Sequence, residues 1–221
     1  MKLALLFPQF APNLYDLASM MKADRVVLQD TERWSRKSRT HRAQIRIVEG
    51  TQWVNLPVRT EDKKKSNAEV RIDHSEAWLE PFWNALEYNY RNSIYFDFYE
   101  AEIRNDLNMA FEFDTLLEFN LYFLSRMFRY LELGISCELS SQLDNYNEDP
   151  DKFAAAAGAD ILFQEYEARN YQRQANGNIL KTALDEHPVY KQHFEGFESE
   201  CCVLDLIFQY GPESFRVLDQ L

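Results

Sequence analysis

The sequence lacks the glycine-rich loops that many nucleotide and cofactor sites use to hold phosphate groups. Only 6 glycines occur in 221 residues, and none stands in a G-x-G-x-x-G or G-x-x-x-x-G-K arrangement. The G-x-S-x-G and H-E-x-x-H motifs and paired Cys/His zinc-ligand sets are also missing. The sequence therefore gives no support for a cofactor or a metal, and we expect neither.

Cysteine is scarce. The 3 cysteines show neither metal-ligand spacing nor the even number of a disulfide framework: Cys137, Cys201 and Cys202. The adjacent pair cannot easily close a disulfide on itself. We expect buried, reduced thiols, with a redox role as the alternative.

Long hydrophobic runs are absent as well. The longest apolar stretch, residues 116–133, is interrupted by two acidic and two basic side chains, so it does not predict a membrane span. Residues 3–7 are too short for the apolar region of a signal peptide. We expect a cytoplasmic protein.

Positive charge is in deficit, with 24 Lys and Arg against 36 Asp and Glu and a formal net charge of −12. Such an excess of acid disfavours a general nucleic-acid binder, because phosphate would be repelled. Hydrophobic residues make up 46% and aromatic residues 14%, enough for a large core. The length predicts a single domain over residues 1–221.

The chain begins with a strand–helix–strand pattern. The apolar run 3–7 predicts a buried strand, residues 14–22 an amphipathic helix and residues 25–30 a second strand. A βαβ unit makes its two strands parallel, and ligands of such sheets bind beyond the carboxyl ends of the strands.

The remaining patterns predict a β-hairpin, further strands and a helical insert. The hairpin spans 44–48 and 52–58, and the helical insert 75–133 contains a long helix capped by Asp114. A short strand is predicted around 70–72. A second αβ pattern follows the insert, with strands at 135–139 and 160–164 and a helix at 150–157. The remaining predicted elements are helices at 165–175 and 201–210, a turn at 176–178 and a loop at 187–197. The fold class is α/β, a three-layer arrangement with a mostly parallel sheet, a β-hairpin and a helical insert.

A basic segment follows the second predicted strand. Six positive charges occur in 14 residues with no acidic residue between them: Arg33, Arg36, Lys37, Arg39, Arg42 and Arg46. Guanidinium groups match phosphate and carboxylate, so we predict a clamp for a small anionic substrate, formed by Arg36, Lys37, Arg39, His41 and Arg42. Asp30, at the end of the strand, is a candidate base or orienting group. The alternative is a basic surface that pairs with the protein's own acids.

Candidate catalytic residues also lie near the carboxyl terminus. His187 precedes a proline, and histidine is suited to proton transfer near neutral pH. Asp205 lies within an apolar helical pattern and needs a partner if buried, such as His187 or an arginine of the basic segment. A loop role for His187 and a helix-capping role for Glu213 stay open.

Several motifs, in order, resemble those of the WbqC-like protein family. Residues 7–12, Phe7-Pro8-Gln9-Phe10-Ala11-Pro12, resemble its HQPNYLPW opening, and residues 30–43 its DDVQFSRRSWQNRNRI stretch. Residues 53–58 are similar to its WLTVPV segment. The tail, His187 to Gln192 and Val203 to Glu213, is similar to HPxYxQ and SxLDLLFNxGPE. The family's Ser-Gly after the late strand is replaced by Phe163-Gln164-Glu165.

The resemblance implies a role in O-antigen or other surface-polysaccharide biosynthesis. It implies a transferase that acylates or aminoacylates an activated amino sugar, such as a nucleotide sugar. His187 would be the general base, oriented by Asp205, and the motifs place Pro8, Tyr190 and Glu213 at the substrate. The alternative function is a non-catalytic interaction protein that docks an acidic partner of a biosynthetic assembly through the basic segment.

Overall fold

The computed structural model describes residues 1–165, 179–180 and 183–221. Its centre is a parallel sheet with the strand order β5-β2-β1-β6-β7. The strands are β1 (Lys2–Leu6), β2 (Arg25–Leu28), β5 (Cys137–Leu139), β6 (Ile161–Gln164) and β7 (Ile179–Leu180). The α/β fold class is confirmed, as is the parallel pairing of the first two strands.

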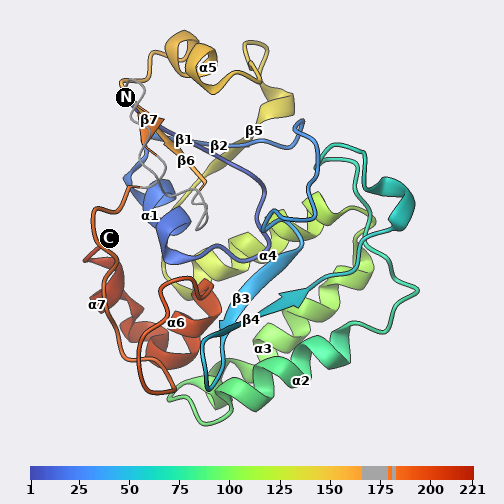
Figure 1. Ribbon diagram of the computed structural model, residues 1–221, viewed down its shortest axis with the longest axis vertical. Coiled ribbons are helices and arrows are strands. Elements are labelled where there is room, and N and C mark those ends of the chain that lie inside the picture. The colour runs from blue at the N-terminus through green and yellow to red at the C-terminus, as the bar shows by residue number, and fades with distance from the viewer. Residues whose placement is uncertain (166–178, 181–182) are drawn as a thin grey trace.

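Helices cover both faces of this sheet, which makes three layers (Figure 1). Leu3 and Leu5 of β1 pack with Phe153 of α5 (Pro150–Ala156) on one face. Ala4 and Leu6 point to the other face and join the main core, which includes α1 (Leu14–Lys22). The alternation of side chains along one strand therefore explains both apolar interfaces.

The β-hairpin and the helical insert complete the main core. The hairpin consists of β3 (Arg42–Arg46) and β4 (Thr51–Asn55), so its first strand starts two residues earlier than predicted. The insert contains α2 (Leu79–Tyr90), α3 (Phe96–Asn108) and α4 (Leu116–Tyr130). The predicted strand around 70–72 is wrong, because Arg71 and Ile72 form isolated bridges instead.

Helix α4 begins at a capping box rather than at the predicted Asp114 cap. The Thr115 hydroxyl accepts from the backbone of Glu118, whose carboxylate accepts from the backbone of Thr115. Farther along the helix, Phe123 stacks on Phe10 with ring centroids 4.8 Å apart. This contact fixes the loop after β1 against α4.

The carboxyl-terminal part forms α6 (Val203–Tyr210) and α7 (Phe215–Leu218). Single 3-10 turns span Thr60–Asp62, Met109–Glu112, Ser140–Gln142 and Gly211–Ser214. The helix predicted over 165–175, apart from Glu165, and the turn at 176–178 lie outside the described residues. Within the described parts of the chain no helix is long and apolar enough to cross a membrane. The cytoplasmic location and the single domain stay predictions.

Gly211 is required at the end of α6, and its replacement tests this packing. Its φ is 47°, and a Cβ there would lie 2.6 Å from Cγ of Tyr95. We expect Gly211→Ala to lower the free energy of unfolding by about 2–3 kcal/mol, measured by urea denaturation. Gly134→Ala is the matched control, because its added Cβ meets nothing within 4 Å. Equal effects of the two substitutions would contradict this packing.

Candidate functional site

The carboxyl ends of the parallel strands bring several polar residues to one edge of the sheet. Gln9 follows β1, Asp30 follows β2, Ser140 follows β5 and Glu165 follows β6. Strands β1 and β6 are in register with Leu5 opposite Gln164, so their following residues emerge side by side. This edge is where open α/β sheets bind ligands.

Asp30 lies at this edge but is occupied by the neighbouring strand end. Its side chain is buried, and Oδ1 accepts from Ser140 Oγ at 2.8 Å and from the Ser141 amide at 2.9 Å. The Ser141 hydroxyl donates to Oδ2 at 2.6 Å. Asp30 therefore fastens the end of β2 to the end of β5, and its catalytic role stays a prediction.

Four buried polar side chains meet beside β1 and β6, and we call them the acid cluster: Gln9, Asp16, Arg39 and Glu165. Gln9 Nε2 donates to Asp16 Oδ2 at 2.9 Å. Arg39 Nη1 donates to Asp16 Oδ2 at 3.3 Å and to Glu165 Oε1 at 3.4 Å. Asp16 is fully buried, and the side chain of Glu165 is 12% exposed. One guanidinium nitrogen of Arg39 thus donates to both carboxylates.

The local structure explains how α1 contributes to the acid cluster. Asn13 caps the helix by accepting from the amide of Asp16 at 3.0 Å. Asp16 lies in the first turn, where the helix amides favour a negative charge. The charge is therefore stabilised by the helix as well as by Arg39.

Glu165 is the group of the acid cluster that is suited to proton exchange. Burial, followed by the negative charge of Asp16, raises the pKa of Glu165 to about 8. The positive charge of Arg39 and hydrogen bonds from the Phe7 amide and Gln9 oppose this rise. Glu165 therefore holds a proton at pH 7 and exchanges it close to neutrality.

The basic segment does not act as one clamp. Arg39 turns inward to the acid cluster, and Arg46 is buried with its guanidinium on the carbonyls of Ile47, Gly50 and Glu195. Both arginines therefore have structural partners. The alternative of pairing with the protein's own acids holds for Arg39, whereas Arg46 binds backbone carbonyls.

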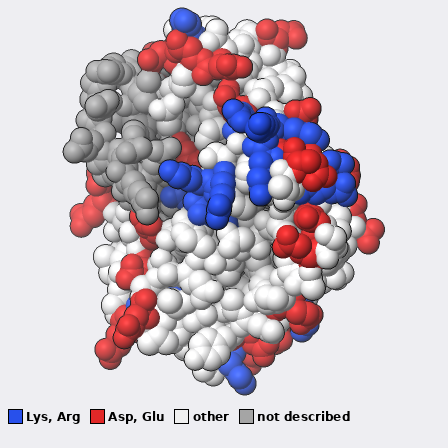
Figure 2. Space-filling model, turned by 45° about the vertical axis from the view of Figure 1, so that its right-hand side comes forward, with Lys and Arg blue, Asp and Glu red and all other residues white. Residues whose placement is uncertain are grey.

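Arg36, Lys37 and Arg42 remain as a positive surface, in which the Arg42 guanidinium also donates to the carbonyls of Lys37 and Ser38. In the described parts of the chain, no Asp or Glu oxygen lies within 4.0 Å of their side-chain nitrogens. Arg42 lies over the Trp53 ring at 4.0 Å, and burial together with the charges of Arg39 and Arg36 lowers the pKa of its guanidinium. Figure 2 shows Lys and Arg gathered on one face of the molecule beside a largely uncharged area.

His41 lies beneath this positive surface. Its ring packs on Trp34 with centroids 5.0 Å apart. Burial, followed by the charges of Arg42 and Arg36, lowers the pKa of His41 to about 4. His41 is therefore neutral at pH 7 and adds no charge to the predicted anion site.

His187 and Asp205 do not form the predicted pair. Asp205 Oδ2 accepts from the Tyr190 hydroxyl at 2.7 Å and from Gln192 Nε2 at 3.1 Å. His187 Nδ1 lies 2.9 Å from the carbonyl of Pro188. Because Tyr190 and Gln192 reach Asp205 from the loop that His187 begins, Asp205 joins that loop to α6 and does not orient the imidazole.

His187 packs against α1, the helix that also carries Asp16. Its ring packs on Tyr15, the neighbour of Asp16, with centroids 4.8 Å apart. Within the described ranges its buried Nε2 has no hydrogen-bond partner, and burial lowers the pKa of the imidazole. Its role as a general base stays a prediction.

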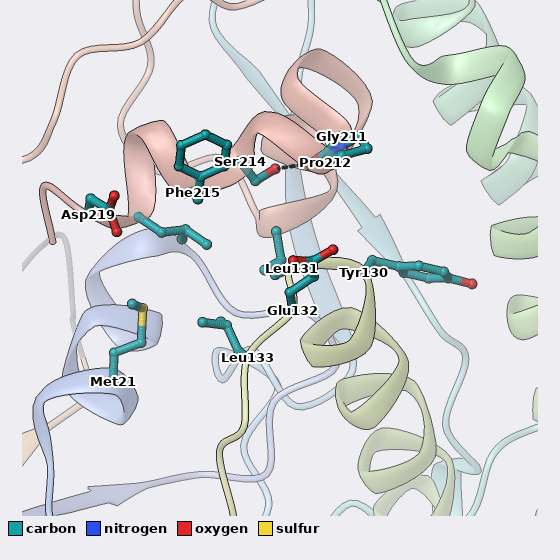
Figure 3. A pocket seen from close by; sticks show the side chains of 11 residues that line it. Met21, Tyr130, Leu131, Glu132, Leu133, Gly211, Pro212, Ser214, Phe215 and Asp219 are labelled. Carbon is teal, nitrogen blue, oxygen red and sulfur yellow. Dashed lines mark hydrogen bonds between the residues drawn. The ribbon is translucent and has the colours of Figure 1, made fainter.

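Glu213 lies away from the acid cluster. It is half-buried and pairs with Arg216 at 3.2 Å. A cavity of about 220 Å³ near it is lined from α1, the end of α4 and the α6–α7 region (Figure 3). Met21, on the opposite end of α1 from Asp16, lines this cavity. The cavity contains none of the predicted site residues.

In residues 1–165, 179–180 and 183–221, no three His, Cys, Asp or Glu side chains are placed to hold a metal ion. The cysteines in these residues are free. Burial raises the pKa of Cys137 to about 11 and that of Cys202 to about 12, so these thiols are protonated.

The site residues predicted from the sequence did not include three members of the acid cluster: Gln9, Asp16 and Glu165. One signal was available, because Glu165 directly follows a predicted strand and Gln9 lies two residues after another. Asp16 also lies among the buried residues of an otherwise apolar helix face. Pro8, which was predicted, lies beside them, and its carbonyl accepts from Asn120 Nδ2 at 2.8 Å.

Comparison with known proteins identifies a family match and a similar protein. The family model described as the WbqC-like protein family matches residues 8–217. An uncharacterized protein of Mycobacterium tuberculosis, Rv1507c, is 25% identical over 228 residues, which cover 96% of this chain and 95% of that protein. No solved structure matches the chain significantly.

The buried, neutral state of His41 predicts a loss of stability in mild acid. Its pKa is about 4 in the folded protein and 6.5 ordinarily, so the unfolded chain binds the extra proton first as the pH falls. Between pH 7 and pH 5 this removes about 2 kcal/mol of folding free energy. We expect His41→Gln to lack that part of the decrease, measured by urea denaturation at each pH. An unchanged pH slope in the variant would contradict the assignment.

Proposed function

We propose that this chain, which belongs to the WbqC-like protein family, is a transferase that acts on a small anionic substrate of the nucleotide-sugar class. The reaction we propose is the acylation or aminoacylation of an activated amino sugar for surface-polysaccharide biosynthesis. The family resemblance suggests this biosynthetic context. The chemistry of the site supports an anionic substrate.

The observation that carries the proposal is the set of cations without acidic partners in the segment that precedes and begins β3. In a chain with a net charge of −12, Arg36, Lys37 and Arg42 have no carboxylate partner in the described ranges. Guanidinium groups bind a diphosphate through paired charge-assisted hydrogen bonds. A small anion can reach these groups without meeting the acidic surface that would repel a nucleic acid.

The acid cluster gives this edge a second kind of chemistry. The charge of Arg39 lowers the pKa of Arg42, so the anion-binding groups and the acid cluster are electrostatic neighbours. Glu165, which exchanges its proton near neutrality, can assist proton transfer to or from a substrate held by the arginines. Binding and proton transfer are the two requirements of a group-transfer enzyme.

Removal of two guanidinium groups tests the proposal. We expect uridine diphosphate sugars to bind the wild-type protein, and the Arg36→Ala/Arg42→Ala variant to bind them about 100-fold more weakly, measured by calorimetry. The loss corresponds to two charge-assisted hydrogen bonds of about 1.5 kcal/mol each.

The control is Arg91→Ala/Arg129→Ala, which removes the same charge from two exposed helix-end positions. The Arg42→Lys variant retains the positive charge while changing the contacts of Arg42 with the carbonyls of Lys37 and Ser38. Absence of binding by the wild type, or equal binding by both double variants, would refute the proposal. Loss of function in cells on charge reversal at residues 36–42, without any nucleotide-sugar binding, would favour the docking protein instead.

A further inference from the structure

We propose that the cavity of about 220 Å³ lined from α1, the end of α4 and the α6–α7 region binds a small aliphatic diamine. One ammonium group of the ligand pairs with the carboxylate of Glu132 and the other with that of Asp219. This second site takes a cation, whereas the site of the proposed function takes an anion, and neither site depends on the other.

Three helices end at this cavity. Met21 is the penultimate residue of α1, Tyr130 is the last residue of α4, and Gly211 follows the last residue of α6. The carbonyl groups at the carboxyl end of a helix carry a partial negative charge, which favours a cation nearby. The backbone therefore makes the cavity attractive to positive charge before any side chain is considered.

Two carboxylates add full negative charges to the lining of the cavity. Glu132 and Asp219 are exposed, and in the described parts of the chain no Lys, Arg or His nitrogen lies within 4.0 Å of their oxygens. Arg216, which precedes Asp219 by three residues, pairs with Glu213 at 3.2 Å instead. Both carboxylates are thus available to a cationic ligand.

The arrangement of the lining favours two separate charges joined by a hydrocarbon chain. Figure 3 shows Glu132 and Asp219 on opposite sides of the cavity, with Met21 and Leu133 below them. Contact with apolar side chains stabilises hydrocarbon but gives nothing to a small inorganic cation. The volume is below the roughly 300–1,000 Å³ of sites for drug-sized ligands, so the ligand is small. The apolar side chains that line the cavity are Met21, Leu131, Leu133, Phe215 and Leu218.

The backbone of Glu132 has a conformation that glycine adopts more easily. Its φ is 57°, and no other non-glycine residue of the described ranges has a positive φ. Glu132 follows α4 in a Schellman motif, in which the amide of Leu133 donates to the carbonyl of Phe128 at 2.8 Å. Glycine is the usual residue at this position, because a side chain adds strain there. Local folding therefore does not account for a glutamate here, whereas a role for its carboxylate in binding does.

Three matched ligands test the site by NMR titration of the wild-type protein. The ligand 1,5-diaminopentane carries two ammonium groups, pentylamine carries one, and 1,5-pentanediol carries none. We expect the diamine to bind about 5-fold more tightly than pentylamine, because one additional exposed ion pair contributes about 1 kcal/mol. The diol should bind more weakly than either amine.

Substitution of each carboxylate tests the assignment of the two ammonium groups. Glu132→Gln and Asp219→Asn should each reduce the affinity for the diamine to that for pentylamine. Glu148→Gln, which removes one exposed negative charge outside the cavity, is the control and should keep the preference.

A further variant, Glu132→Gly, separates binding from folding. Because glycine relieves the strain of the positive φ, we expect this variant to unfold at the same or a higher urea concentration than the wild type. It should nevertheless lose the preference for the diamine.

Equal affinities of the wild type for the diamine and pentylamine, or an unchanged preference after either carboxylate is replaced, would overturn the diamine site. Chemical-shift changes confined to residues outside the cavity would overturn it as well. None of these results bears on the anion site, whose test uses uridine diphosphate sugars and the Arg36→Ala/Arg42→Ala variant.

Discussion

Parallel pairing of β1 with both β2 and β6 is the constraint on which the candidate site depends. Because the three strands run in one direction, the residues that follow them emerge at a single edge of the sheet. Gln9 and Glu165, which are far apart in sequence, meet there beside the first turn of α1. The stacking of Phe10 on Phe123 then holds the loop after β1 in place. The fold thus creates a buried polar cluster beside the apolar core.

The electrostatics of this edge follow from how the basic segment is divided. Arg39 is buried and compensates carboxylates that would otherwise be expensive to remove from water. Arg36 and Arg42 stay near the surface, and neither has an acidic partner in the described parts of the chain. Residues 36–42 therefore supply both the buried guanidinium that compensates the carboxylates and the surface groups that we propose bind an anion. The acidic excess of the whole chain limits the size of the anion rather than excluding it.

Local patterns predicted the elements well but not the contacts between them. The periodicity of residues 14–22 predicted α1 with its observed bounds, and the βαβ unit predicted parallel pairing. The first strand of the hairpin lies two residues earlier than predicted, because alternation alone does not determine which pairs bond. The expected His187–Asp205 pair failed for a related reason, since Tyr190 and Gln192 competed for the same carboxylate. The hydrogen bonds of the acid cluster join residues up to 126 positions apart, which no local pattern encodes.

A structure of the protein bound to a uridine diphosphate amino sugar tests the central claim most directly. The account predicts the diphosphate at Arg36 and Arg42. Density for the ligand in the cavity between α1 and α7, or anywhere away from the carboxyl edge of the sheet, would contradict it.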